Sequence, residues 1–356
     1  MIAPGQSQKG GQGSNQTQVA GDMIVNIGIT EERAQEIALA TARSVVQDFA
    51  VESHEVLQNR VEELDQRVIK SLSAADALDS FADPAFIRSY KHAQEGAAAS
   101  ERPADYDMLA ALLTDRAKNP RERPRIVGID GAIDIVDRID TEALRALTVC
   151  NAVASWRPRA FLVGQGLETL EYIFATLADG PLPEGVDWLD HLDALNVVRR
   201  NSFGSMKSME QFYGEQLIGY IAPGITADEV PQFVGADLLD EPWPLLILPH
   251  ELKTGFMRIA VVDVEQLESQ LRAAGKSDGY LETVKGQAAS VFGLGQQDPV
   301  ARAELMSRIR ALPHFGLVVN WWDRNIQNGY HITPIGKALA RANAFRLDTE
   351  QRLERD

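Results

Sequence analysis

The feature that most constrains this chain is a long stretch without glycine or proline, which lies between Gly28 and Pro84. Thr30 suits the N-cap of a helix, and two glutamates follow it, where the helix dipole favours negative charge. Apolar residues then recur at spacings of three and four, the period of one helix face. We therefore predict one long helix from Thr30 to Leu72. Its later apolar positions alternate steps of four and three, as in a coiled coil: Leu57, Val61, Leu64 and Val68.

A short segment that favours β structure lies immediately before this helix. Residues Met23–Ile29 are rich in β-branched side chains, within a longer motif from Gln16 to Thr30 that also carries Gln, Asn and Gly. A strand this short is not stable alone, so it must pair elsewhere in the fold, pair with other copies, or stay disordered. We favour pairing between copies in a closed homo-oligomer over a disordered tail or an open cross-β stack. A trimer is favoured over a dimer, because short strands close readily around a threefold axis. The predicted oligomerisation residues are Ile24, Val25, Ile27, Ile29, Leu57, Val61, Leu64 and Val68.

The predicted fold is mainly α, and the sequence pattern divides the chain into five segments. They are a disordered tail (1–15), the oligomerisation motif with its long helix (16–72), a helical domain (73–156), a helical and winged-helix-like domain (157–347) and a charged tail (348–356). Within them, Asp83 with Pro84 and Thr333 with Pro334 each have the pattern of an N-cap followed by proline at the first helical position. The other predicted helices are 103–118, 126–139, 141–156, 167–177, 187–200 and 264–274, with a strand in 254–262.

The C-terminal end is predicted to resemble a winged helix. Gly316–Val319 reads as a strand, Asn328-Gly329 as a hairpin turn, and Tyr330–Ile332 as the returning strand before the last helix. The basic residues Arg324, Lys337 and Arg341 could contact nucleic acid there, and two neighbouring tryptophans, Trp321 and Trp322, could stack on bases or fill the core. The formal net charge of −16 opposes phosphate, so nucleic-acid binding is the weaker interpretation.

Cysteine content and hydropathy limit the protein's class further. A single cysteine, Cys150, excludes an intrachain disulfide and any multi-thiolate metal site, and it fits a reducing cytoplasm. Its place on the apolar stripe of a predicted helix indicates a buried structural thiol. No secretory signal is evident, and the apolar run Pro244–Pro249 is far too short to span a bilayer. We expect a cytoplasmic protein with no membrane partner.

No motif of known catalytic chemistry is present in the sequence. There is no GxxxxGK[ST] loop, HExxH or GxSxG, and the Gly-x-Gly fragments lack the third glycine of a dinucleotide site. Asp187, Asp190 and His191 share one face of a predicted helix and could hold a divalent ion. Acidic residues at a helix start are the simpler interpretation, so we predict no catalytic residue, no metal and no cofactor. A metal-dependent enzyme built on these three residues stays as an alternative.

Five stretches of the sequence carry a resemblance to a known family: 18–28, 83–86 with Ala93-Gln94, 112–117, 132–147 and 332–340. They resemble an uncharacterised bacterial family found beside anti-phage defence genes. The closing segment is also similar to that of abortive-infection proteins of the Abi-alpha type. This resemblance implies a role in defence or stress signalling, and it implies no catalytic residues.

The leading hypothesis is therefore a non-enzymatic, oligomeric assembly or sensor protein of anti-phage defence, acting on an unknown protein partner. A nucleic-acid-binding regulator that acts through the C-terminal wing is the first alternative, and the metal-dependent enzyme is the second.

Removing residues 1–29 should lower the mass of the particle in solution and leave the rest of the chain folded. The reason is that no strand near Met23–Ile29 in the sequence can cover its two faces, whereas symmetric copies can. Light scattering at micromolar concentration measures this mass. A full-length chain that is already a monomer would contradict the prediction.

Overall fold

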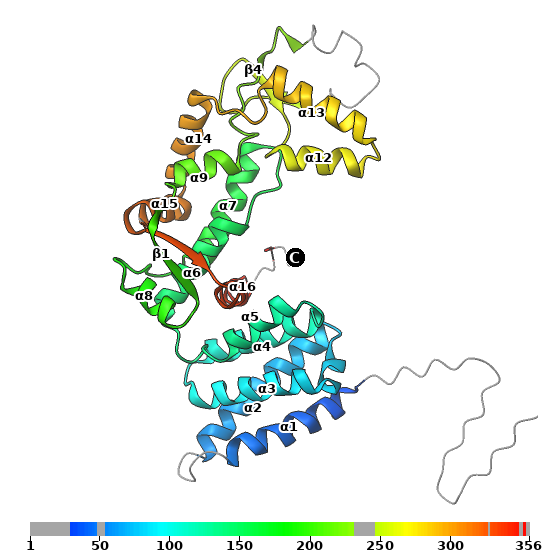
Figure 1. Cartoon of the computed structure of the whole chain (residues 1–356), viewed down its shortest axis with the longest axis vertical. Helices are drawn as coiled ribbons and strands as arrows, with labels where there is room; N and C mark the ends of the chain where they lie inside the picture. The colour runs from blue at the N-terminus through cyan, green and yellow to red at the C-terminus, as the bar shows by residue number, and fades with distance from the viewer. Residues whose placement is uncertain (1–28, 48–53, 231–245, 327, 349–351, 354–356) are drawn as a thin grey trace, which may run out of the picture.

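The computed structural model describes residues 29–47, 54–230, 246–326, 328–348 and 352–353. Helices make up most of this part of the chain, and its strands form two small antiparallel sheets. The molecule is elongated, with α1–α5 at one end, α12 and α13 with β4 at the other, and α16 between α5 and the middle layer (Figure 1). The prediction of a mainly α fold is confirmed.

Two helices, α1 (Glu31–Gln47) and α2 (His54–Ala74), occupy the stretch predicted as one helix. They are antiparallel, because the first turns of α1 share a core with the end of α2 and its last turns share a core with the start of α2 (Figure 1). The prediction of one continuous helix is wrong. Folding back lets the alanine-rich face of α1 cover the Leu and Val stripe of α2, whereas a continuous helix would leave both stripes in water. The sets that share a core are Ala34 and Ala38 with Leu64 and Val68, and Ala42 and Val45 with Leu57 and Val61.

A 3-10 turn and three more helices complete what we call the N-terminal module, α1–α5. The Asp83 carboxylate accepts a hydrogen bond from the Ala85 N–H at 2.9 Å, and Pro84 occupies the first helical position, so the predicted cap is confirmed. The helix expected over 126–139 ends instead at Ile133. The elements are η2 (Leu78–Ala82), α3 (Pro84–Ala99), α4 (Pro103–Lys118) and α5 (Arg123–Ile133).

The C-terminal helix α16 (Pro334–Leu347) connects this module to the rest of the chain. It packs on α4 and α5 on one side and on α6 (Thr141–Ser155) and α7 (Val163–Leu177) on the other (Figure 1). Thr333 caps it as predicted, since its Oγ1 accepts a hydrogen bond from the Gly336 N–H at 3.2 Å. One hydrophobic core therefore runs through both halves of the chain, from Ala34 to Leu353.

A two-stranded sheet lies beside α16 and differs from the predicted wing. Strand β5 (Asn328–Ile332) pairs antiparallel with β1 (Val198–Ser205), a segment more than a hundred residues away in sequence. The helix predicted over 187–200 is wrong beyond α8 (Asp187–Ala194), because Asn196 adopts a positive φ of 59° and redirects the chain into β1.

The strand predicted at Gly316–Val319 is wrong, because this segment lies inside α15 (Pro313–Asn325). A short apolar run does not distinguish a strand from a buried helix, and here the burial follows a helical period. Phe315, Val318, Val319 and Trp322 are all buried on the inner side of α15.

The far end of the molecule has its own hydrophobic core. The strands β2 (Ile225–Thr226), β4 (Phe256–Ile259) and β3 (Ile247–Pro249) form a sheet in that order, covered by α13 (Asp278–Phe292) and α12 (Val264–Ala273). The predictions of a strand within 254–262 and of a helix beginning at Val264 are confirmed. The remaining helices are α9 (Met209–Gln216) and α14 (Pro299–Ala311).

Replacing Gly128 by alanine should destabilise the contact between α5 and α16. A Cβ at this position would lie 2.6 Å from the backbone oxygen of Pro334, so the two helices must move apart. We expect a loss of about 1–3 kcal/mol in the free energy of unfolding, as for other overpacked sites. Chemical denaturation measures it.

Gly286→Ala in α13 is the matched control, because no atom lies within 4 Å of its Cβ position. This variant should be neutral or more stable by about 0.5–1 kcal/mol, since alanine favours a helix over glycine. Equal stability of the two variants would contradict the close contact at Gly128.

Candidate binding groove

The predicted oligomerisation residues divide between the interior of one chain and residues outside the structure. Leu57, Val61, Leu64 and Val68 are each at most 6% exposed, because α1 and the rest of the N-terminal module cover them. The coiled-coil pattern therefore reflects packing within the chain. Ile29 is half-buried, and its backbone N–H donates to the Asp79 carboxylate. Ile24, Val25 and Ile27 lie outside the described residues.

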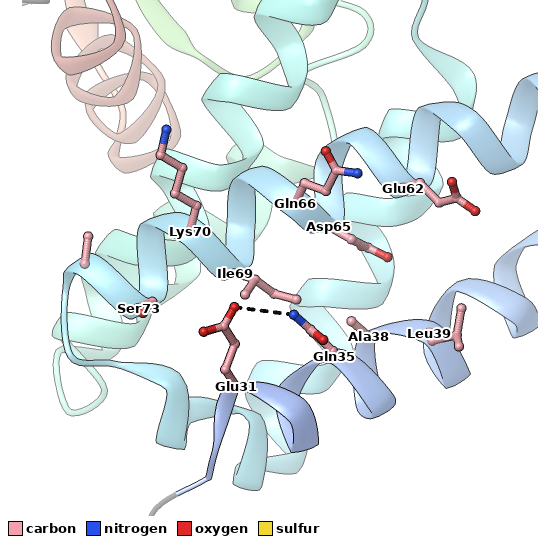
Figure 2. Close-up of a pocket in the computed structure, with 11 residues that line it drawn as sticks. Glu31, Gln35, Ala38, Leu39, Glu62, Asp65, Gln66, Ile69, Lys70 and Ser73 are labelled. Carbon is pink, nitrogen blue, oxygen red and sulfur yellow. Dashed lines mark hydrogen bonds between the residues drawn. The ribbon is translucent and has the colours of Figure 1, made fainter.

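An open groove of about 760 Å³ runs along the surface where α1 meets α2. We call it the α1–α2 groove (Figure 2). Its apolar lining includes Leu39, which is 48% exposed although it is a large hydrophobic side chain. Three carboxylates and one lysine also line it, and Lys70 points away from Asp65 in Figure 2. The lining residues are Glu31, Gln35, Ala38, Leu39, Glu62, Asp65, Gln66, Ile69, Lys70, Ser73 and Ala74.

Asp65 is the lining residue with the most unusual environment. The Tyr90 hydroxyl donates a hydrogen bond to its carboxylate, and the Gln94 side-chain amide donates a second one at 2.9 Å. Both donors come from α3 and are neutral, and Tyr90 and Gln94 are fully buried. Among the described residues, Asp65 has no salt bridge to a basic side chain. Within the described part of the chain, it is a carboxylate without a compensating cation.

Burial raises the pKa of Asp65 from 3.8 to about 6. Desolvation is the main cause, and the nearby like charge of Glu62 adds to it. The hydrogen bonds from Tyr90 and Gln94 act in the opposite direction and are too weak to restore the ordinary pKa. Burial also raises the pKa of the Tyr90 hydroxyl, so this group stays a donor at neutral pH. The ionised Asp65 carboxylate is therefore stabilised only in part by its hydrogen bonds.

The residues of the proposed metal alternative do not form a metal site. Asp190 pairs with Arg200, and the Nε2 atom of His191 accepts a hydrogen bond from the Asp140 backbone N–H at 3.1 Å. No group of three or more His, Cys, Asp or Glu residues in the described part of the chain is arranged to hold a metal ion. Asp187, at the start of the same helix, therefore belongs to the helix-start surface that the simpler interpretation predicts.

The tryptophans near the predicted wing fill the core. The indole N–H of Trp321 donates to the Pro183 carbonyl at 2.8 Å, and that of Trp322 donates to the Lys207 carbonyl at 3.0 Å. Both rings are buried, so neither is free to stack on a base. Of the basic residues predicted to contact nucleic acid, Arg324 and Lys337 are exposed and Arg341 is half-buried.

Cys150 is the buried structural thiol that the sequence predicts. Its side chain is 1% exposed, and burial raises its pKa to about 12. A thiol with so high a pKa is a poor nucleophile at neutral pH.

Sequence reasoning missed the α1–α2 groove and Asp65. Asp65 stands between Leu64 and Gln66 in a helix with many acidic residues, and nothing in that pattern separates it from its exposed neighbours. Its partners Tyr90 and Gln94 lie more than twenty residues away, and only the packing of α3 on α2 brings them together. The one signal in the sequence is that Asp65 is a polar residue directly beside the buried Leu and Val stripe of α2.

The fold and the groove define a mainly helical protein with an open surface site on its N-terminal module. A family model whose description reads ":-like" matches residues 28–353, and the chain belongs to that family. No curated protein matches the chain, and no solved structure matches it. Among the helices in the described part of the chain, none combines the length and the apolar character that crossing a bilayer requires.

The stability of the protein should depend on pH through Asp65, in a direction that the Asp65→Asn variant reveals. Because the folded state raises this pKa from 3.8 to about 6, the folded state binds more protons than the unfolded state between these pH values. Stability from this group is therefore lost as the pH rises from about 4 to about 6. The variant should match the wild type near pH 4 and be more stable at pH 7 by about 3 kcal/mol.

Denaturation of both proteins across this pH range measures the difference. Glu55→Gln, on the exposed face of the same helix, is the control and should change stability by less than about 0.5 kcal/mol at either pH. An Asp65→Asn variant that is less stable than the wild type at pH 7 would show that the carboxylate is stabilised by the fold.

Proposed function

We propose that this protein is a non-enzymatic assembly or sensor protein that acts by binding a partner at the α1–α2 groove. The observation that carries this proposal is the groove itself, an open surface that combines the exposed side chain of Leu39 with a half-buried carboxylate that has no salt bridge among the described residues. Exposed apolar surface next to unsatisfied charge is typical of a site that another molecule covers.

The groove lies on a packed support. Its floor belongs to the core of the N-terminal module, where Ala38 and Ile69 are buried and Gln94 bonds to both α1 and α2. Through α5 and α16 the module is packed against the second half of the chain. A partner that shifts α1 against α2 would therefore act on helices connected to the whole molecule, as signalling by a sensor requires.

The oligomer is the second part of the proposal. Residues 23–29 lead directly into α1, and Glu31 in the first turn of α1 lines the groove. Pairing of this segment between copies would bring several grooves together and raise the avidity for a partner with repeated sites. The Leu57-to-Val68 stripe takes no part in this assembly, because it is buried within one chain.

A role in anti-phage defence in the cytoplasm is supported by the resemblance of the sequence stretches to a family found beside defence genes. We propose this setting as the biological context in which the groove acts, and we propose no enzymatic step.

Leu39→Arg should abolish protection against phage, because it places a large charged side chain in the groove beside Glu62 and Asp65. Val56→Arg is the matched control, since Val56 is exposed on α2 to a similar extent and does not line the groove. Plaque counts on strains that express each variant, challenged with a panel of phages, measure protection.

Melting curves of both variants accompany the plaque counts and should match the wild type. Full protection by Leu39→Arg would contradict a function at the groove. Loss of protection by both variants to the same degree would also contradict it.

A further inference from the structure

Two acceptor groups, one that lines the α1–α2 groove and one buried behind it, have no positive partner among the described residues. The first is the Asp65 carboxylate, which receives hydrogen bonds from neutral donors only and has the like charge of Glu62 nearby. A carboxylate in such surroundings is expected to take up a cation, because pairing offsets the cost of its desolvation.

The second acceptor is the side-chain oxygen of Gln94. This side chain is fully buried, and its Oε1 atom has no hydrogen-bond partner among the described residues. The amide nitrogen of the same group donates to Asp65 on α2 and to the Ala38 carbonyl on α1, at 2.9 Å and 3.4 Å. The amide therefore connects α1 and α2 beneath the groove, next to Asp65, and does not line the groove itself. A buried acceptor without a partner is rare in proteins, and here it adds uncompensated negative potential behind Asp65.

The shape and lining of the groove select the kind of cation. Three carboxylates against one lysine give a negative lining, and Figure 2 shows Ile69 and Ala38 between Glu31 and Asp65, with Leu39 farther along α1 below Glu62. Apolar walls around an acidic end suit the alkyl stem of a basic side chain. They do not suit a hydrated inorganic ion, which prefers several oxygen ligands.

The length of the groove favours a polypeptide over a small amine. Its α2 wall extends from Glu62 to Ala74, which corresponds to about 18 Å of helix. An extended segment of about five residues covers this distance. The volume of about 760 Å³ is also larger than one side chain needs.

We propose that the α1–α2 groove binds a basic segment of a partner polypeptide, with an arginine or lysine side chain paired to Asp65. Apolar residues that flank this cation in the partner lie on Leu39 and Ile69. The inference rests on the proposed function and adds to it the chemical class of the partner.

The test uses a fluorescein-labelled peptide, Ala-Leu-Ala-Arg-Ala-Leu-Ala, and measures its binding to the full-length chain by fluorescence anisotropy. The same peptide with citrulline in place of arginine is the neutral control. The arginine peptide should bind about tenfold more tightly or better, because a buried charge pair contributes at least that much. Equal binding of the two peptides would overturn the proposal.

Two variants of α2 locate the contact. Asp65→Asn should weaken binding of the arginine peptide about tenfold or more, whereas Glu55→Gln removes the same charge from an exposed position and should change it less than about twofold. If both variants weaken peptide binding equally, the peptide is attracted to the overall negative charge of the protein. That result would overturn the assignment of the contact to Asp65. Binding to the wild type should also weaken about tenfold from pH 7 to pH 5, as protons compete for Asp65.

Two further experiments distinguish a basic polypeptide from other occupants of the groove. Free spermidine should displace the peptide poorly, and displacement at equal concentration would assign the groove to a small polyamine instead. Lys9→Gln removes the one basic side chain among residues 1–28 and should leave peptide binding unchanged. Tighter binding in this variant would assign the groove to the chain's own N-terminal segment.

Failure of this inference is distinguishable from failure of the proposed function. If Leu39→Arg abolishes protection while neither peptide binds, the groove is functional and takes a ligand of another class. If the arginine peptide binds through Asp65 while Leu39→Arg still protects, the groove binds basic chains and protection does not depend on it.

Discussion

The packing of α1 onto α2 is the interaction on which the N-terminal module depends. A face of small alanines on α1 covers the Leu and Val stripe of α2, and this burial removes from water the pattern that would otherwise drive association between copies. The same packing sets the two walls of the α1–α2 groove. It also encloses Asp65 on one side, where Tyr90 and Gln94 of α3 supply neutral donors and no charge. The packing that stabilises the module therefore also forms the groove.

Those parts of the fold that depend on local hydrogen bonds could be predicted from the sequence. Asp83 and Thr333 cap their helices as expected, because a side chain and a backbone N–H two or three residues apart suffice to form the cap. Two predictions that depended on distant segments were wrong. Nothing near Gly316–Val319 shows that this run packs as a helix, and nothing near Val198 shows that it pairs with Ile332. Contacts with distant parts of the chain decide both the helix at Gly316–Val319 and the pairing of Val198 with Ile332.

The candidate site was less accessible to sequence reasoning than the fold. The coiled-coil spacing of Leu57 to Val68 correctly marks a buried seam, but spacing does not say whether the partner helix belongs to the same chain. The cluster Asp190 with His191 has the ligand types of a metal site, and an arginine and a backbone N–H take up those groups instead. Asp65 has no motif, because its character comes from burial and from partners on another helix.

The central claim is that Asp65 is a partly buried carboxylate that pairs with a cation of a partner. Carbon-13 NMR of its side-chain carboxyl tests this claim most directly. The Asp65→Asn variant assigns the signal by its disappearance. In the free protein the carboxyl should titrate with a pKa of about 6, and saturating arginine peptide should move that pKa downward, because a bound cation favours the ionised form. A carboxyl that titrates near the ordinary value of 3.8 and does not respond to the peptide would contradict the account.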